Sequence, residues 1–226
     1  MPPERQYYSG KLIGNTPVAG DWRLLRLEQA ELAGTIRPGQ RLAVVSGPTR
    51  IEAYVNHLAS DWLALLAPPT DTAAALPAFG EVAIEGPLGV GWRDTHTAAP
   101  AVVLAAGAGI AAALALVERL DPPPKLVLLD SAGLPFPFRP QPSTFVIGGL
   151  PPPVIAAAPL LEDRGVPSRL ADPDGRPGCF EGSIVDLFRL WLAGHPSSGL
   201  DVFACLPAES LAELRQYPML RIREAE

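Results

Sequence analysis

Residues 98–117 form a run of twenty positions without a charged side chain, and two glycines interrupt it near the middle. The part before Gly107 is short and apolar, whereas the part after Gly109 is rich in alanine and leucine and ends at Glu118. This pattern predicts a strand, a tight turn and a helix. Backbone N–H groups at such a turn lie at a helix N-terminus, where a phosphate binds well. The run therefore indicates a nucleotide site, and a purely structural turn is the open alternative.

A membrane span is the other structure that such a run permits, because twenty uncharged residues are long enough to cross a bilayer. The run is mostly alanine and glycine, contains Pro100 and lacks a flanking basic cluster, which favours a soluble strand–helix unit. The N-terminus is polar and has no apolar segment typical of a signal peptide. We therefore predict a cytoplasmic protein without a membrane span.

Charge and residue usage exclude several classes of function. The net charge of −6 argues against nucleic acid as a partner, because no basic face is available for phosphates. Two cysteines are too few for a disulfide framework, and the three histidines lack metal-ligand spacing. We therefore predict neither a disulfide scaffold nor a metal site.

The two halves of the chain show different patterns. Short apolar segments separated by turn residues predict a small antiparallel β-barrel in residues 1–95. Its expected strands are 7–13, 22–28, 41–46, 50–55, 62–67 and 81–85, with one helical turn at 72–76. Residues 96–226 alternate between strands and helices, which predicts a doubly wound parallel sheet with helices on both faces. We place the domain boundary in the polar stretch 93–100.

The expected elements of the second half follow from its periodicity and its capping residues. Strands are predicted at 102–106, 126–130, 145–147, 166–170, 200–204 and 219–222. Helices are predicted at 110–120, 152–164 and 208–216, and another extends from the capping box that begins at Ser183 to Ala193. Ligands bind at the carboxyl ends of the strands in such a sheet.

Three predicted strand ends carry candidate functional residues. The first has Gly107, Ala108, Gly109 and Ile110, which approximate a dinucleotide-binding turn, and the others have Gly148-Gly149 and Cys205-Leu206-Pro207. Asp130 ends the neighbouring strand and is predicted to contact a ribose. Cys205 is either a reactive thiol or a small buried residue. Trp92 either stacks on a flat ring or is a core aromatic.

The order of these motifs resembles the ferredoxin–NADP reductase family, and within it the electron-transfer subunits of dihydroorotate dehydrogenase. The resemblance covers most of the chain and rests on short motifs. Residues 37–40 (RPGQ), 86–89 (GPLG), 107–110 (GAGI) and 204–207 (ACLP) correspond to motifs of that group, and so do segments at 136–140, 160–170 and 177–182.

The resemblance implies FAD in the barrel and an NAD(P)H site in the second domain, with electrons passing onward to a redox protein partner. It further implies that Arg50 and Thr72 hold FAD phosphates. Gly86, Pro87, Leu88 and Gly89 would line the flavin edge, while Gly107–Ile110 would hold the dinucleotide phosphates. Cys205 and Pro207 would lie near the nicotinamide, with Cys205 as the candidate catalytic residue. Asp130 at a ribose favours NADH over NADPH.

The chain departs from the family pattern at the flavin. Ala53 stands where the family has a hydroxyl, Asp71 stands in the turn under the pyrophosphate, and Leu206 replaces a glycine. The cysteine-rich segment for an iron–sulfur cluster is absent, so we expect no such cluster.

These departures favour an alternative, a cofactor-free paralogue that serves as an assembly or regulatory subunit of a redox complex. A nucleotide-binding sensor is a third hypothesis.

Overall fold

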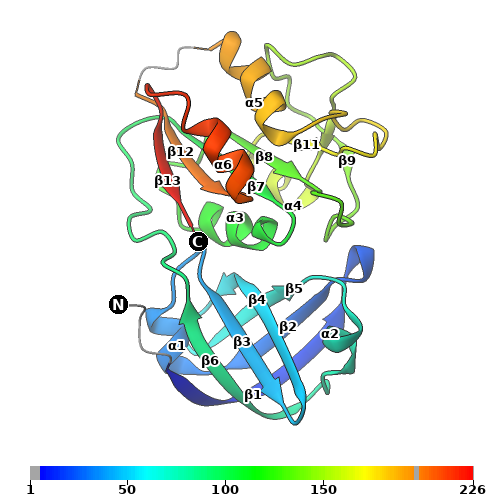
Figure 1. Cartoon of the computed structure of the whole chain (residues 1–226), viewed down its shortest axis with the longest axis vertical. Coiled ribbons are helices and arrows are strands. Elements are labelled where there is room, and N and C mark those ends of the chain that lie inside the picture. Colours follow the sequence, from blue (N-terminus) through cyan, green and yellow to red (C-terminus); the bar gives the residue numbers. More distant parts are fainter. Residues whose placement is uncertain (1–5, 196–198, 226) are drawn as a thin grey trace.

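A computed structural model describes residues 6–195 and 199–225 and places a β-barrel next to an α/β domain (Figure 1). The barrel strands are β1 (Tyr7–Pro17), β2 (Arg23–Glu28), β3 (Arg41–Ser46), β4 (Thr49–Leu58), β5 (Trp62–Ala67) and β6 (Gly80–Leu88). They close in the order β1-β2-β5-β4-β3-β6, with every neighbouring pair antiparallel. The predicted barrel is therefore confirmed.

Alternation along β4 shows how the barrel fills its interior. Ile51, Ala53 and Val55 are buried in the barrel core, whereas Arg50 and Glu52 lie on the outer face. Because side chains of a strand alternate between faces, this register also places Tyr54 outside. The outward face of β4 is the part of the barrel that meets the second domain.

Three short helical segments connect the barrel strands: η1 (Ala19–Asp21), α1 (Ala30–Thr35) and α2 (Asp71–Ala75). The Thr70 side chain caps α2 by accepting a hydrogen bond from the Ala73 amide. Asn15 donates to the carbonyls of Ala73 and Leu76, which fixes the helix to β1. The sequence predicted α2 but missed α1, which begins after Gln29 caps the Leu32 amide.

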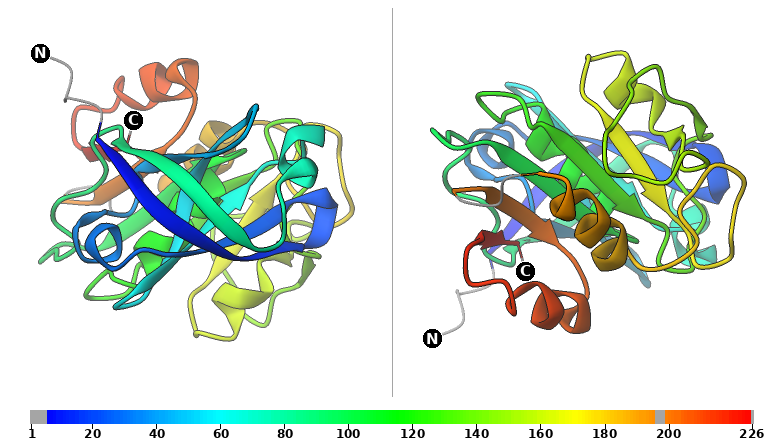
Figure 2. Two further views of the ribbon diagram at one scale, coloured as in Figure 1. Left: turned by 90° about the horizontal axis from the view of Figure 1, so that it is seen from below. Right: turned by 90° about the horizontal axis from the view of Figure 1, so that it is seen from above.

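The second domain contains a five-stranded parallel sheet in the order β11-β8-β7-β12-β13. Its strands are β7 (Ala101–Ala106), β8 (Leu126–Asp130), β11 (Ser168–Ala171), β12 (Asp201–Cys205) and β13 (Arg221–Glu224). The sheet core separates into two apolar clusters, with α3 (Gly109–Val117) and α4 (Pro159–Glu162) on one face and α5 (Ile184–Ala193) and α6 (Ala208–Leu214) on the other. The right-hand view of Figure 2 shows α5 and α6 on the same side. The doubly wound prediction is confirmed.

The segment between β8 and β11 differs from the prediction. Residues 145–147 are not a strand, and the helix expected at 152–164 is reduced to α4. A two-residue strand pair, β9 (Gln141–Pro142) and β10 (Ala156–Ala157), takes their place. The buried Arg169 guanidinium donates to the Phe145 and Val154 carbonyls. The apolar residues of this segment therefore belong to a loop that Arg169 holds in place, and not to a strand followed by a long helix.

The charge-free run 98–117 is divided between β7 and α3. Across the part of the chain that the structure describes, no helix has the length and apolar character needed to cross a membrane. Gly109 starts α3, and a Cβ atom there would lie 2.6 Å from the Cys205 carbonyl oxygen and 2.8 Å from its sulfur. The missing side chain therefore lets α3 approach the end of β12.

We predict that Gly109→Ala lowers the free energy of unfolding by about 1–3 kcal/mol, because the added methyl group overpacks the α3–β12 contact. Gly34→Ala in α1 is the matched control, since a Cβ there has no atom within 4 Å. Replacing a helical glycine at an open site leaves stability unchanged or raises it by up to about 1 kcal/mol. Chemical denaturation of both variants measures the difference, and equal stabilities would contradict the packing assignment.

Candidate functional site at the domain junction

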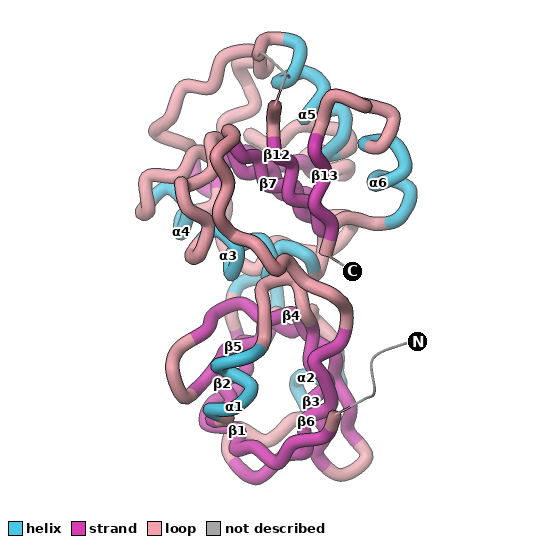
Figure 3. Tube along the Cα trace, turned by 90° about the vertical axis from the view of Figure 1, so that its left-hand side faces the viewer, coloured by secondary structure: helices cyan, strands magenta, loops and turns pink. Residues whose placement is uncertain are grey.

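The candidate site lies where the carboxyl ends of β7, β8 and β12 meet the outer face of the barrel (Figure 1). The chain order reverses between β7 and β12, which is the usual ligand position in a doubly wound sheet. Helix α3 begins at this point and packs against β4, and Figure 3 shows it between the sheet and the barrel. Residues from both domains therefore surround the predicted nucleotide turn.

The turn at 107–110 has the expected backbone geometry. Gly107 has φ +54°, and its amide donates to the Asp130 carbonyl. No side chain caps the N-terminus of α3. Ile110 is fully buried in the sheet core. A strand–turn–helix unit with an uncapped helix start is thus present, and its phosphate-binding role remains a prediction.

Barrel and loop residues cover this turn. Trp22, which is fully buried, packs with Ala111 of α3 and with the partly buried Ala108 and Leu134. The Trp22 indole N–H donates to the Pro135 carbonyl at 2.7 Å. The loop after β8 therefore closes onto the barrel beside the start of α3.

The Asp130 carboxylate is engaged within the protein. One oxygen accepts from the Ala132 amide at 2.8 Å, and the other accepts from the Ile184 amide at the start of α5 at 3.0 Å. Burial raises the pKa of Asp130, and the two amide hydrogen bonds oppose that shift. Asp130 thus holds a loop and a helix N-terminus, and the proposed ribose contact stays untested.

Cys205 meets a tyrosine of the barrel at the domain junction. The half-buried Tyr54 packs against the apolar cluster that contains Cys205, and the cysteine is 3% exposed. Burial raises the pKa of Cys205 to about 11 and also raises the pKa of Tyr54. The thiolate is the nucleophilic form, so burial and a raised pKa disfavour reaction of Cys205 near neutral pH. This geometry supports the small buried residue rather than the reactive thiol.

Arg50, the predicted phosphate ligand, is paired with carboxylates of its own domain. Its guanidinium contacts Glu52 at 2.8 Å and Glu85 at 3.1 Å, and the Glu85 side chain is nearly buried. These hydrogen bonds, first that of Glu52 and then that of Glu85, raise the pKa of Arg50. Arg41 lies 3.7 Å from Glu52 and stacks over the Tyr54 ring. Two arginines and two glutamates from β3, β4 and β6 therefore form a charge-balanced set.

The remaining predicted residues do not converge on one cavity. Thr72 is exposed on α2, and Pro207 is exposed before α6. The Gly86–Gly89 segment ends β6, and the Gly89 carbonyl accepts a hydrogen bond from Gln40. Trp92 is 4% exposed, and its indole N–H donates to the Arg223 carbonyl. Trp92 is therefore the core aromatic of its two sequence interpretations.

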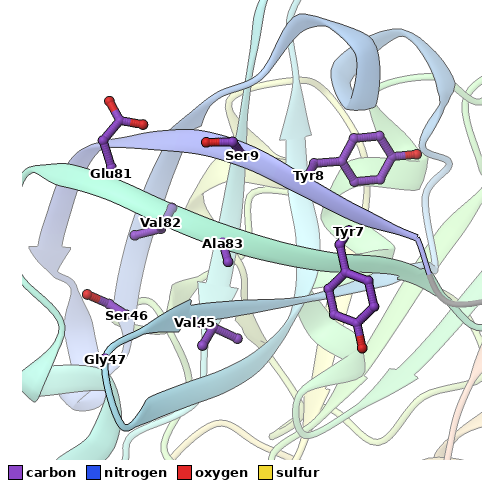
Figure 4. Close-up of a pocket in the computed structure, with 9 residues that line it drawn as sticks. All are labelled: Tyr7, Tyr8, Ser9, Val45, Ser46, Gly47, Glu81, Val82 and Ala83. Atoms are coloured by element: carbon purple, nitrogen blue, oxygen red, sulfur yellow. The ribbon is translucent and has the colours of Figure 1, made fainter.

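A groove of about 560 Å³ lies elsewhere, on the outer barrel face between β1, β3 and β6. Figure 4 shows Tyr7 at one end and Glu81 at the other. None of the predicted site residues lines it. Among the residues that the structure describes, no group of three or more metal-ligating side chains occurs either.

Sequence reasoning missed the residues that pack at the junction, Trp22, Tyr54 and Leu134. It also missed the carboxylate partners of Arg50, which are Glu52 and Glu85. A signal was present for two of them, because strand alternation puts Glu52 and Tyr54 on the same face as Arg50. Trp22 and Leu134 meet only through tertiary packing, which local patterns do not report.

We predict that Tyr54→Ala uncovers Cys205, so that iodoacetamide alkylates its thiol about tenfold faster at mildly alkaline pH, whereas the native protein resists. Tyr7→Ala is the control, because Tyr7 is 70% exposed and belongs to the distant groove. Peptide mapping by mass spectrometry separates Cys205 from Cys179. Equal Cys205 rates in all three proteins would contradict the contact.

Comparison with family models and with curated protein sequences gives no match. Solved structures do match along nearly the whole chain. A ferredoxin reductase in carbazole 1,9a-dioxygenase is 12% identical with a TM-score of 0.68, covering 100% of this chain and 71% of that one. An NADH-dependent reduced ferredoxin–NADP oxidoreductase has the same identity and TM-score, covering 95% and 74%.

A third structure is a ferredoxin–NADP reductase from Neisseria gonorrhoeae with bound FAD and NADP. It is 14% identical with a TM-score of 0.56 and covers 99% of this chain and 100% of that one. These identities are too low to transfer an activity. The chain has the two-domain fold of ferredoxin reductases.

Proposed function

We propose that this chain is a subunit of a redox complex that has a reductase fold, holds no flavin of its own and acts through protein contacts. The assembly or regulatory role of the alternative hypothesis is the function that the geometry supports best. The observation that supports it is the packing of Tyr54 of the barrel against the apolar cluster of the second domain that contains Cys205.

The first argument concerns the position of the flavin ring. The resemblance expects a flavin against residues 50–53 and a nicotinamide beside Cys205. Here Tyr54 of β4 packs against the apolar cluster that contains Cys205, and Ala53 lies in the barrel core. Trp22 and Leu134 close the adjoining space beside Ala108. The chain's own side chains therefore fill the region between the two predicted cofactors.

The second argument concerns charge. A pyrophosphate needs a cation with free hydrogen-bonding capacity, but Arg50 is shared between Glu52 and Glu85. Two phosphate charges beside these carboxylates would be repelled, and Asp71 in the first turn of α2 adds a further negative charge. Glu52, Glu85 and Asp71 therefore oppose the phosphates of FAD in this arrangement. On this proposal no electron-transfer step is assigned to this chain.

The proposed partner is a larger oxidoreductase that supplies the redox centres. A fold shared with ferredoxin reductases gives a surface suited to such an enzyme, and among the structural matches is a ferredoxin reductase in carbazole 1,9a-dioxygenase. In this proposal the packed domain junction supports the surface that contacts the partner and does not bind a cofactor.

A flavoprotein that passes electrons from NAD(P)H through FAD to a protein partner is the second candidate. It is favoured by the shared fold, which includes a reductase with bound FAD and NADP, and by the retained Gly86–Gly89 and Gly107–Ile110 motifs. In that case Tyr54 would have to leave Cys205 before a flavin could enter.

We predict that purified protein incubated with excess FAD and then desalted shows no flavin absorbance and does not reduce ferricyanide with NADH or NADPH. The reason is the filled junction and the neutralised Arg50. A known ferredoxin reductase treated in parallel is the positive control. A yellow protein that reduces ferricyanide would establish the second candidate instead.

We further predict that the tagged chain, expressed at its natural level, co-purifies in fixed stoichiometry with an oxidoreductase that contains flavin or an iron–sulfur cluster. Mass spectrometry and the absorbance spectrum of the complex identify the partner and its cofactors. Elution of the chain alone, at the size of its own polypeptide, would contradict the proposal.

A further inference from the structure

Two adjoining hollows lie along β1 on the outer wall of the barrel. The first, of about 560 Å³, lies between β1, β3 and β6 (Figure 4), and the second, of about 570 Å³, lies beside β1, β2 and α1. Ser9 and Glu81 line both hollows, which therefore form one trough. Figures 1 and 3 both show β1 on the side of the barrel that faces away from the α/β domain. The trough is thus separate from the candidate site.

Strand register explains why the first hollow exists. Ala83 of β6 is the cross-strand partner of Ser9 on β1 and of Val45 on β3. Side chains at paired positions stand on the same face of the sheet, and these three are all short. Two positions before Ser9, the same face carries Tyr7, which is 70% exposed. The first hollow therefore has a floor of short side chains and an aromatic ring at one end, as Figure 4 shows.

The other end of the trough is negatively charged. Its exposed charged residues are four carboxylates and one ammonium group, namely Glu28, Glu31, Asp61 and Glu81 with Lys11. Among the residues that the structure describes, none forms an ion pair with any of these four carboxylates. Four negative charges against one positive charge leave three in excess, so this end attracts an incoming cation.

The two ends together define what fits the trough. The short floor beside Tyr7 has room for an apolar side chain, and the carboxylates at the other end suit a lysine or an arginine. Tyr7 and Lys11 are four residues apart on β1, which is about 13 Å at roughly 3.3 Å per residue. An extended segment along β1 therefore matches the trough when its apolar and basic residues are about four positions apart.

We propose that this trough binds an exposed, extended segment of the partner oxidoreductase, with an apolar side chain on the floor beside Tyr7 and a basic side chain at the carboxylates. The inference rests on the proposed function, because it assigns the surface through which such a subunit makes its contact. Helix α3 packs on the barrel at β4, so the partner binds the opposite wall. Charge attraction orients the segment, and burial of its apolar side chain holds it.

The test titrates the partner oxidoreductase, recovered from the native complex, with the purified chain and with two variants. Calorimetry gives dissociation constants at about 0.1 M and about 1 M salt, where charges are screened over about 10 Å and about 3 Å. Glu81→Lys reverses the carboxylate that both hollows share, and it should weaken binding about tenfold at the lower salt concentration and about twofold at the higher. Ala83→Trp fills the floor and should weaken binding about tenfold at both.

Asp163→Lys is the matched control, because it makes the same change of charge at an exposed residue that follows α4 in the second domain. It should bind as the native chain does. Native-like binding by either folded variant would overturn the trough and leave the proposed function standing. A dimer of the chain alone that Ala83→Trp dissociates would also overturn it, because a second copy would then occupy the trough. Recovery of no oxidoreductase with the native chain would overturn both proposals.

Discussion

The direct packing of α3 on β4 is the contact on which the rest of the molecule depends. Gly109 lets the helix approach the Cys205 backbone, and Tyr54 extends from the barrel to the same cysteine. Beside this contact, the Trp22 indole N–H donates a hydrogen bond to the Pro135 carbonyl. The indole N–H of the buried Trp92, which follows β6, donates to the Arg223 carbonyl of β13. Apolar contacts from two clusters thus join the two domains. Flavoproteins of this fold are expected to place a cofactor between such domains, whereas here side chains meet.

Carboxylates recur at the positions where an anionic cofactor would need positive charge. Glu52 and Glu85 neutralise Arg50, Asp130 accepts from the first amide of α5, and Asp71 lies in the first turn of α2. Each of these carboxylates already neutralises a cation or stabilises a helix N-terminus within the protein. At Arg50 and in the first turn of α2, an incoming phosphate would be opposed by a carboxylate that is already present.

The fold was largely predictable from sequence, because alternation in β4 and the glycine break after β7 are local signals. The loop between β8 and β11 was not, since its apolar residues are fixed by Arg169, whose partners are distant in sequence. The motifs of the candidate site were recognisable in the sequence, but the contacts that their residues make were not. The turn at Gly107 was recognised, yet the Tyr54–Cys205 contact joins residues 151 positions apart, and only the closed barrel brings them together.

A crystal structure of the chain grown in excess FAD tests the central claim most directly. The account predicts that Tyr54 remains packed against the cluster that contains Cys205, that Arg50 remains paired with Glu52 and Glu85, and that no flavin lies between the domains. A flavin ring between β4 and the end of β12, with Tyr54 displaced from Cys205, would contradict it.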